Sequence, residues 1–133
     1  SIEVMTDTST VNVWAPELFW DDVKQQAVII WASCIPGKFP DGQEDHKNNH
    51  RLYYTTTKDF KKFTPAKLMI EPGFSSIDAT LVKRGKNDYV MVLKDNTRPE
   101  RDIKVAYAKS PYGPWSKASE PFTGKMMEGP TTV

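Results

Sequence analysis

Three residues, Trp14, Asp78 and Glu128, each stand at the start of a similar stretch of sequence and together could bind and cleave a sugar. An indole ring stacks on the apolar face of a sugar ring, and carboxyl groups supply the acid and base for cleaving a glycosidic bond. Both carboxylates also have ordinary uses, because Asp before a strand commonly caps a turn and Glu before Gly-Pro commonly faces solvent. The elements that position them therefore decide the interpretation.

The pattern around these residues predicts β-strands. Apolar residues form short runs rich in Val, Ile, Tyr, Phe and Trp, separated by Gly, Pro, Asn and Asp, and helical periodicity is almost absent. Two polar segments, Asp21–Gln26 and Lys83–Asp88, are predicted hairpin loops. The fold class is therefore all-β with antiparallel meanders. The predicted strands are Val11–Trp14, Leu18–Trp20, Ala27–Ala32, Arg51–Thr57, Ala79–Lys83, Tyr89–Lys94 and Ile103–Lys109.

The strands repeat in blade-like units, approximately 11–70 and 75–123, and a third unit begins at 128. The Ile35–His50 insertion, which contains both histidines, accounts for the greater length of the first unit. Four short strands at a period of about 50 residues are typical of a β-propeller blade. A β-sandwich with strands that happen to look alike is the alternative. We expect part of a propeller, about two blades plus the first strand of a third, whose ring needs the remaining blades of a parent chain.

Composition excludes several classes of protein. The chain has 133 residues, with 18 Lys and Arg against 17 Asp and Glu, so it lacks the cationic surplus that nucleic-acid binding requires. The longest apolar run, Ala27–Ala32, is too short to cross a bilayer, and we expect no membrane partner. One cysteine, Cys34, cannot form a disulfide framework or a cysteine-based zinc site. The hydrophobic content, 38%, is that of a globular protein.

The blade openings and the joints between strands resemble glycoside hydrolase family 43. The openings are Trp14-Ala15-Pro16-Glu17, Ser76-Ile77-Asp78-Ala79 and Glu128-Gly129-Pro130. The joints are Thr57–Phe63 and Lys109–Ser116, the second of which contains the order Ser, Gly-Pro-Trp-Ser. No single motif is decisive, but their order and spacing together are fairly specific. The resemblance spans nearly the whole chain and only part of the family's catalytic domain. The invertase-like propellers are less similar, because their acid and stabiliser stand in other sequence contexts.

The resemblance implies a five-bladed β-propeller that hydrolyses glycosidic bonds with inversion. Glu128 matches the family's general acid, and Asp78 matches the Asp that tunes and orients that acid. The general base belongs to the preceding blade, and the surroundings of Asp7 do not match its motif, so the base is missing from this chain. By itself this stretch of 133 residues is therefore expected to be inactive. No cofactor is expected, and the only ion that the resemblance allows is a structural calcium in the complete propeller.

Other residues have two alternative interpretations each. Trp14 is either a sugar platform or packing between blades, and Glu17 either contacts substrate hydroxyls or makes a structural hydrogen bond. Arg98 either binds substrate from a loop beside the channel or pairs with Glu100 or Asp102 at the surface. His46 and His50 have the spacing of a metal site on a helix, but their loop is expected to be a mobile, lid-like insertion without zinc.

The expected function is glycoside hydrolysis of plant-type oligo- or polysaccharides, with an arabinoside, xyloside or galactoside as substrate. Export to the periplasm or the exterior is expected from the family's polymeric substrates. The alternative is a non-catalytic carbohydrate-binding β-propeller, which would keep Trp14 and lack the base. A protein-interaction propeller is a third alternative, and it would have no acidic cluster in its channel.

Overall fold

A computed structural model describes residues 4–40, 43–99 and 101–121, and it confirms the all-β class. Within these residues seven strands form two antiparallel sheets, each built from strands that follow one another along the chain. The first sheet has the order β1 (Trp14–Asp21), β2 (Gln26–Cys34), β3 (His50–Thr57) and β4 (Lys67–Ile70). The second has the order β5 (Ser76–Gly85), β6 (Asp88–Asp95) and β7 (Asp102–Ala108).

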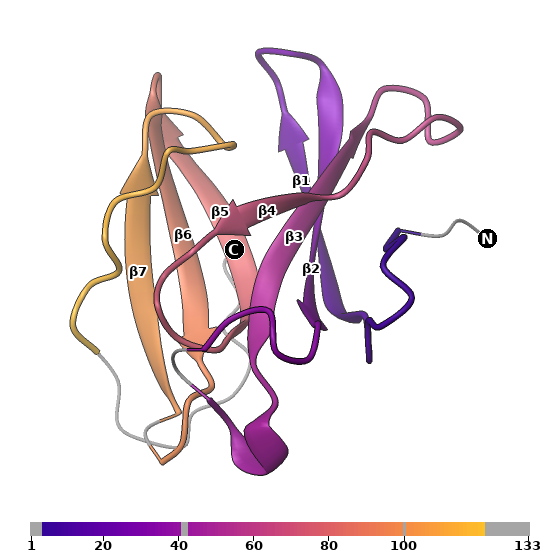
Figure 1. Cartoon of the computed structure of the whole chain (residues 1–133). Coiled ribbons are helices and arrows are strands. Elements are labelled where there is room, and N and C mark those ends of the chain that lie inside the picture. The colour runs from indigo at the N-terminus through magenta and orange to yellow at the C-terminus, as the bar shows by residue number, and fades with distance from the viewer. Residues whose placement is uncertain (1–3, 41–42, 100, 122–133) are drawn as a thin grey trace.

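The two sheets lie side by side, as Figure 1 shows, and enclose a common apolar core. Val28 and Leu52 from the first sheet pack with Met91 and Leu93 from the second, and all four side chains are buried. The first strands of the two sheets, β1 and β5, pack against each other. The β2–β3 and β6–β7 connections lie at one end of the sheets, and the β1–β2 and β5–β6 hairpins lie at the other (Figure 1).

Two strand predictions need correction. Val11–Trp14 and Leu18–Trp20 were expected as separate strands, but one strand, β1, runs continuously from Trp14 through Pro16 to Asp21. Pro16 is tolerated because it lies on an edge strand and inside a bulge, where the pairing jumps from Trp14 to Glu17. The short strand β4 was not predicted, since its four residues follow a Pro-containing polar segment that reads as loop.

The edge of the second sheet beyond β7 is covered by the segment that follows it. Ser116 and Ser119 donate their backbone N–H groups to the carbonyls of Tyr107 (2.7 Å) and Val105 (2.8 Å). Their hydroxyls accept the backbone N–H groups of the same two residues. Figure 1 shows this segment running beside β7. Side-chain hydroxyls thus replace part of the ladder that a regular fourth strand would make.

No helix in the described part of the chain is long and apolar enough to span a membrane. One turn of 3₁₀-helix, Asp45–Lys47, lies in the β2–β3 connection.

Candidate substrate-binding site

Both first strands carry the same backbone irregularity near their beginning. In β1 the pairing skips between Trp14 and Glu17, and in β5 it skips between Ile77 and Thr80. A residue with positive φ lies inside each bulge, Ala15 at 49° and Asp78 at 51°. The bulges therefore make Ala15, not Trp14, the counterpart of Asp78. This corrects the sequence alignment of the units, which was set on residue types and ran one position out of register.

Asp78 occupies a costly backbone conformation. The left-handed region favours glycine and is unfavourable for other L-residues by roughly 1–2 kcal/mol, although Asp is among those that tolerate it best. The surrounding structure maintains this conformation, because the ladder is regular on both sides of the bulge. A bulge re-aims the side chain that it carries, and the Asp78 side chain remains half-buried. Strained positions of this kind cluster at functional sites.

The two bulged segments are joined by a hydrogen bond between neighbouring sheets. The Thr80 hydroxyl donates to Glu17 Oε1 at 3.1 Å, and both side chains are at least half-buried. Trp14 and Glu17 thus lie on β1, which packs against β5, the strand that carries Asp78. Glu17 makes the structural hydrogen bond that was one of its two expected roles, and only one of its carboxylate oxygens takes part in that bond.

Trp14 lies flat on an imidazole ring. Its ring centroid is 4.5 Å from that of His50, and the planes are inclined by 20°. The Trp14 residue is 47% exposed, whereas His50 is completely buried. Trp14 therefore uses one face for this stack and remains about half exposed to solvent, which is the geometry that a platform for a sugar ring requires.

The imidazole is fixed in one tautomer by its neighbours. The Asn12 amide oxygen accepts the Cys34 backbone N–H at 3.2 Å, which directs the Asn12 NH₂ group toward His50 Nε2 at 2.9 Å. Nε2 therefore accepts a hydrogen bond, and the proton resides on Nδ1, which donates to Glu44 Oε1 at 2.6 Å. The backbone N–H of His50 donates to the Ser75 hydroxyl at 2.9 Å.

Glu44 is the acceptor at the centre of this network. Its side chain is 6% exposed, and its Oε1 also accepts a hydrogen bond from the Ser75 hydroxyl. Burial alone would raise the pKa of Glu44, but hydrogen bonds from His50, Ser75 and Asn96 outweigh it and hold the pKa below its usual value. Glu44 is consequently a carboxylate at neutral pH. It ties the β2–β3 connection to the beginning of the second sheet.

Arg98 holds two connections together at this same end of the sheets. Its Nε donates to Asp45 Oδ2 at 2.9 Å and its Nη1 to the backbone carbonyl of Asn96 at 2.7 Å. Its backbone N–H donates to the Gln43 carbonyl at 3.3 Å. The β6–β7 connection is thereby clamped to the β2–β3 connection. The described partners of the Arg98 side chain are thus Asp45 and Asn96.

The β2–β3 insertion was expected to be lid-like and mobile, but its last part is anchored. The guanidinium of Arg51 is buried, binds both Glu71 oxygens at 3.0 and 2.8 Å, and lies 4.6 Å from the Phe39 ring. The Asn49 amide donates to the Phe39 carbonyl at 2.6 Å. His46 and His50 have the spacing of a metal site on a helix, but the structure separates them, with His46 exposed in the turn and His50 buried at the start of β3.

Two carboxylates remain, Glu128, which was expected to be the general acid, and Asp7, which was not expected to be the base. Glu128 lies outside the described residues. Asp7 is exposed and closes a local turn, in which its Oδ1 accepts the Ser9 hydroxyl and the Ser9 backbone N–H at 2.9 Å, and these bonds lower its pKa. This use is structural and agrees with the mismatch between its sequence context and a general base. Among residues 4–40, 43–99 and 101–121, no three His, Cys, Asp or Glu side chains are grouped as metal ligands would be.

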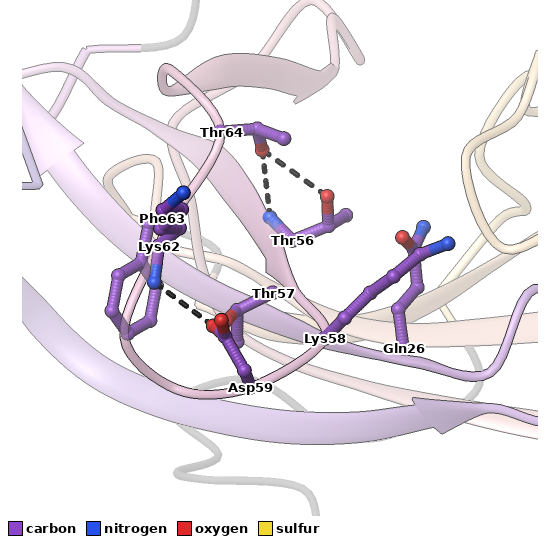
Figure 2. A pocket seen from close by; sticks show the side chains of 8 residues that line it. All are labelled: Gln26, Thr56, Thr57, Lys58, Asp59, Lys62, Phe63 and Thr64. Carbon is purple, nitrogen blue, oxygen red and sulfur yellow. Dashed lines mark hydrogen bonds between the residues drawn. The ribbon is translucent and has the colours of Figure 1, made fainter.

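A surface pocket of about 390 Å³ lies at the far end of the first sheet from Trp14, between β3 and the turn that follows it. Figure 2 shows its lining. Asp59 accepts the backbone N–H groups of Lys61 and Lys62, both at 2.9 Å, which lowers the pKa of Asp59. Thr64 Oγ1 accepts the Thr56 N–H at 2.9 Å. The polar groups are used to close the turn, so we place the candidate site at Trp14 and Asp78.

The family model for a probable glycosyl hydrolase domain related to glycoside hydrolase family 43 matches residues 1–133. The chain belongs to this family. Among curated proteins it is similar to an α-L-arabinofuranosidase of Bifidobacterium longum subsp. longum, with 28% identity over 147 aligned positions. That alignment covers 90% of this chain and 14% of the relative, so the chain spans about one seventh of that protein's length.

Two solved structures share the fold at 17% sequence identity. A glycosyl hydrolase from Bacteroides ovatus matches with a TM-score of 0.58, over 79% of this chain and 30% of that one. A structure from the GH130 family of mannoside phosphorylases, which contains glycoside hydrolases that target β-1,2 mannosidic linkages in Candida mannan, matches with a TM-score of 0.60 over 82% and 31%. These neighbours have propeller-type folds, which confirms that this domain of the family is part of a β-propeller.

Proposed function

We propose that the protein carrying this chain hydrolyses O-glycosidic bonds of plant-type oligo- or polysaccharides, with arabinofuranosides as the first candidate substrate and xylosides and galactosides next. The family and the similarity to an arabinofuranosidase support this choice. The observation that carries it is the pair of matched bulges, which place an exposed indole on β1 and a strained Asp on the adjoining β5. Export is part of the proposal, since polymeric substrates lie outside the cell.

In the proposed mechanism Glu128 protonates the leaving oxygen while a base from another blade activates water on the opposite face of the sugar. This arrangement inverts the anomeric configuration. The Asp78 carboxylate opposes ionisation of a nearby Glu128 and so keeps the acid protonated at the working pH. Only carboxyl groups are required, and no cofactor enters the proposal.

Substrate contacts in the proposal come from the residues gathered around the bulges. Trp14 presents its open face to a sugar ring, and the carboxylate of Glu17 accepts hydrogen bonds from sugar hydroxyls. Arg98 binds substrate from the β6–β7 connection, where Asp45 and Asn96 fix its guanidinium. The first sheet supplies the platform and the second supplies the residue that tunes the acid.

The test uses the longest natural chain that contains this sequence. Aryl α-L-arabinofuranosides, β-xylosides and galactosides are compared, and the anomer formed first is identified by proton NMR. Glu128→Gln should lower kcat on a natural glycoside by about 10²–10⁴-fold, and much less on an aryl glycoside, whose leaving group needs little protonation. Full turnover of the natural glycoside by this variant, or retention of configuration, would show the assignment to be wrong.

The non-catalytic alternative is a carbohydrate-binding propeller, and the exposed face of Trp14 favours it as much as it favours an enzyme. This alternative predicts that the full chain binds an oligosaccharide in calorimetry, that Trp14→Ala abolishes the binding, and that no glycoside is cleaved. Cleavage of any glycoside in the panel, lost in Asp78→Asn, decides against it.

A further inference from the structure

The buried imidazole of His50 supports the Trp14 ring, and the role inferred for it rests on the proposed function. A half-exposed indole on an edge strand has few neighbours to fix its ring plane. Here one neighbour is a fully buried imidazole, 4.5 Å away and nearly parallel. A ring that packs on one side and remains open on the other can act as a platform only when its orientation is maintained before the ligand arrives.

His50 is well suited to maintain it, because each of its hydrogen-bonding groups has a partner. Asn12 binds Nε2, Glu44 binds Nδ1, and Ser75 binds the backbone N–H. These three partners come from the segment before β1, from the β2–β3 connection and from the residue just before β5. The plane of the imidazole is therefore set by Asn12 and Glu44, from two separate parts of the fold, while Ser75 fixes the backbone that carries it.

The network buries polar side chains beneath one exposed ring. Glu44 is a nearly buried carboxylate and His50 a completely buried imidazole, and groups of this kind are costly to bury unless fully hydrogen-bonded. A leucine or phenylalanine at position 50 would fill a buried site without that cost. The imidazole differs from them in having its plane determined by hydrogen bonds as well as by packing.

We propose that His50 is a positioning residue for carbohydrate binding: locked by Asn12 and Glu44, its imidazole fixes the plane of Trp14, whose opposite face receives the sugar ring. His50 does not touch the sugar, since it is buried beneath Trp14 and its two ring nitrogens are engaged. Its contribution passes entirely through the indole.

The test is a double-mutant cycle on the full natural chain, with a glycoside that the wild type cleaves. Trp14→Ala should raise KM by roughly tenfold. His50→Asn, which removes the aromatic stack, should raise KM about fivefold while kcat changes less. In the Trp14→Ala background, His50→Asn should have no further effect, because the ring that it supports is gone. An equal effect of His50→Asn in both backgrounds overturns the proposal.

Arg51→Met is the matched control. Arg51 is the next residue of β3, is equally buried and also anchors the β2–β3 connection, but through Glu71, Asn49 and the backbone carbonyl of His50 rather than through the imidazole. It should leave KM near the wild-type value. If it raises KM as much as His50→Asn does, the effect is a general loosening of the connection and the proposal fails. Where His50→Asn does not accumulate in folded form, Asn12→Ala replaces it, because it releases Nε2 and keeps the ring.

A second readout separates this proposal from the proposed function. In protein labelled with 5-fluorotryptophan, the ¹⁹F resonance of Trp14 is assigned by its loss in Trp14→Phe. His50→Asn should shift or broaden that resonance without any sugar, and an unchanged resonance overturns the supporting role even in an active enzyme. If the resonance responds to His50→Asn but no glycoside is cleaved and no oligosaccharide perturbs it, the proposed function fails, and the sugar platform fails with it.

Discussion

The hydroxyl of Tyr112 links the two sheets, and its removal gives the sharpest test of the described packing. Tyr112 donates to Oδ2 of the buried Asp21 at the end of β1, and accepts from Gln26 Nε2 at 2.7 Å. Tyr112→Phe leaves that carboxylate oxygen without its donor. A hydrogen bond to a charged group contributes roughly 1.5–3 kcal/mol. The lower end applies, because Asp21 Oδ1 keeps the Val23 and Lys24 N–H groups.

We therefore expect Tyr112→Phe to lower the free energy of unfolding by about 1.5 kcal/mol at pH 7, measured by urea denaturation of the full chain with tryptophan fluorescence. Tyr54→Phe is the control. Tyr54→Phe removes the hydroxyl from a neighbouring ring, whose centroid is 5.8 Å from that of the Tyr112 ring. Equal, near-zero effects of both variants would mean that the Asp21–Tyr112 bond does not hold the sheets together.

The same bond predicts a pH dependence. Burial, and then the hydrogen bond to Asp21, raise the pKa of Tyr112 above its ordinary value of 10.0. A raised pKa in the folded state stabilises the fold below the unfolded pKa and loses that contribution as the pH rises. The difference in unfolding free energy between wild type and Tyr112→Phe should thus be constant up to about pH 9 and shrink above pH 10. A difference that grows in alkali would refute the reasoning.

Two further predictions concern the strained bulge and the buried carboxylate. Asp78→Gly and Asp78→Ala both remove the carboxylate, and both should lose turnover of a natural glycoside. Because Gly tolerates φ 51°, the Gly variant should be more stable than the Ala variant by about 1 kcal/mol in urea denaturation. Equal stabilities of the two variants would mean that the bulge relaxes. The pKa of Glu44 is lowered from 4.5, so its contribution to stability is present above that pH and lost as the pH falls. The stability advantage of wild type over Glu44→Gln should therefore shrink in acid, and a constant advantage from pH 7 to pH 3 would contradict the network.

Much of the fold is legible in the sequence because it depends on local patterns. Short runs of apolar and β-branched residues in β2, β3, β6 and β7 and the polar segments between them predict strands and hairpin loops directly. The failures have a common cause in backbone geometry. A bulge at Pro16 hides a continuous strand, and a one-residue offset between two bulges cannot be seen from residue types, which made Trp14 rather than Ala15 the expected counterpart of Asp78.

The site itself was only half predictable. Trp14, Glu17 and Asp78 were selected because their types suit sugar chemistry and their motifs match the family. Glu44 and Asn12 carried no signal, because their contacts to His50 arise where the β2–β3 connection folds back on the segment before β1. The spacing of His50 from His46 drew attention to it, but its partners are Asn12 and Glu44. A contact between connections that are distant in sequence cannot be predicted from a pattern in one sequence.

The clamp between the two connections also bears on the order in which the structure assembles. Each sheet is a meander whose neighbouring strands are close in sequence, so each can form by closing short loops, which is fast. The Ser75–Glu44 and Arg98–Asp45 bonds join residues 31 and 53 positions apart, which lie in the connections between strands. Because closing a longer loop costs more entropy, we expect these bonds to form after the strand pairs within each meander. We therefore expect the connections that carry Glu44, Asp45, Ser75 and Arg98 to assemble last and to open first. Hydrogen exchange should show their backbone amides to be less protected than those of the strands.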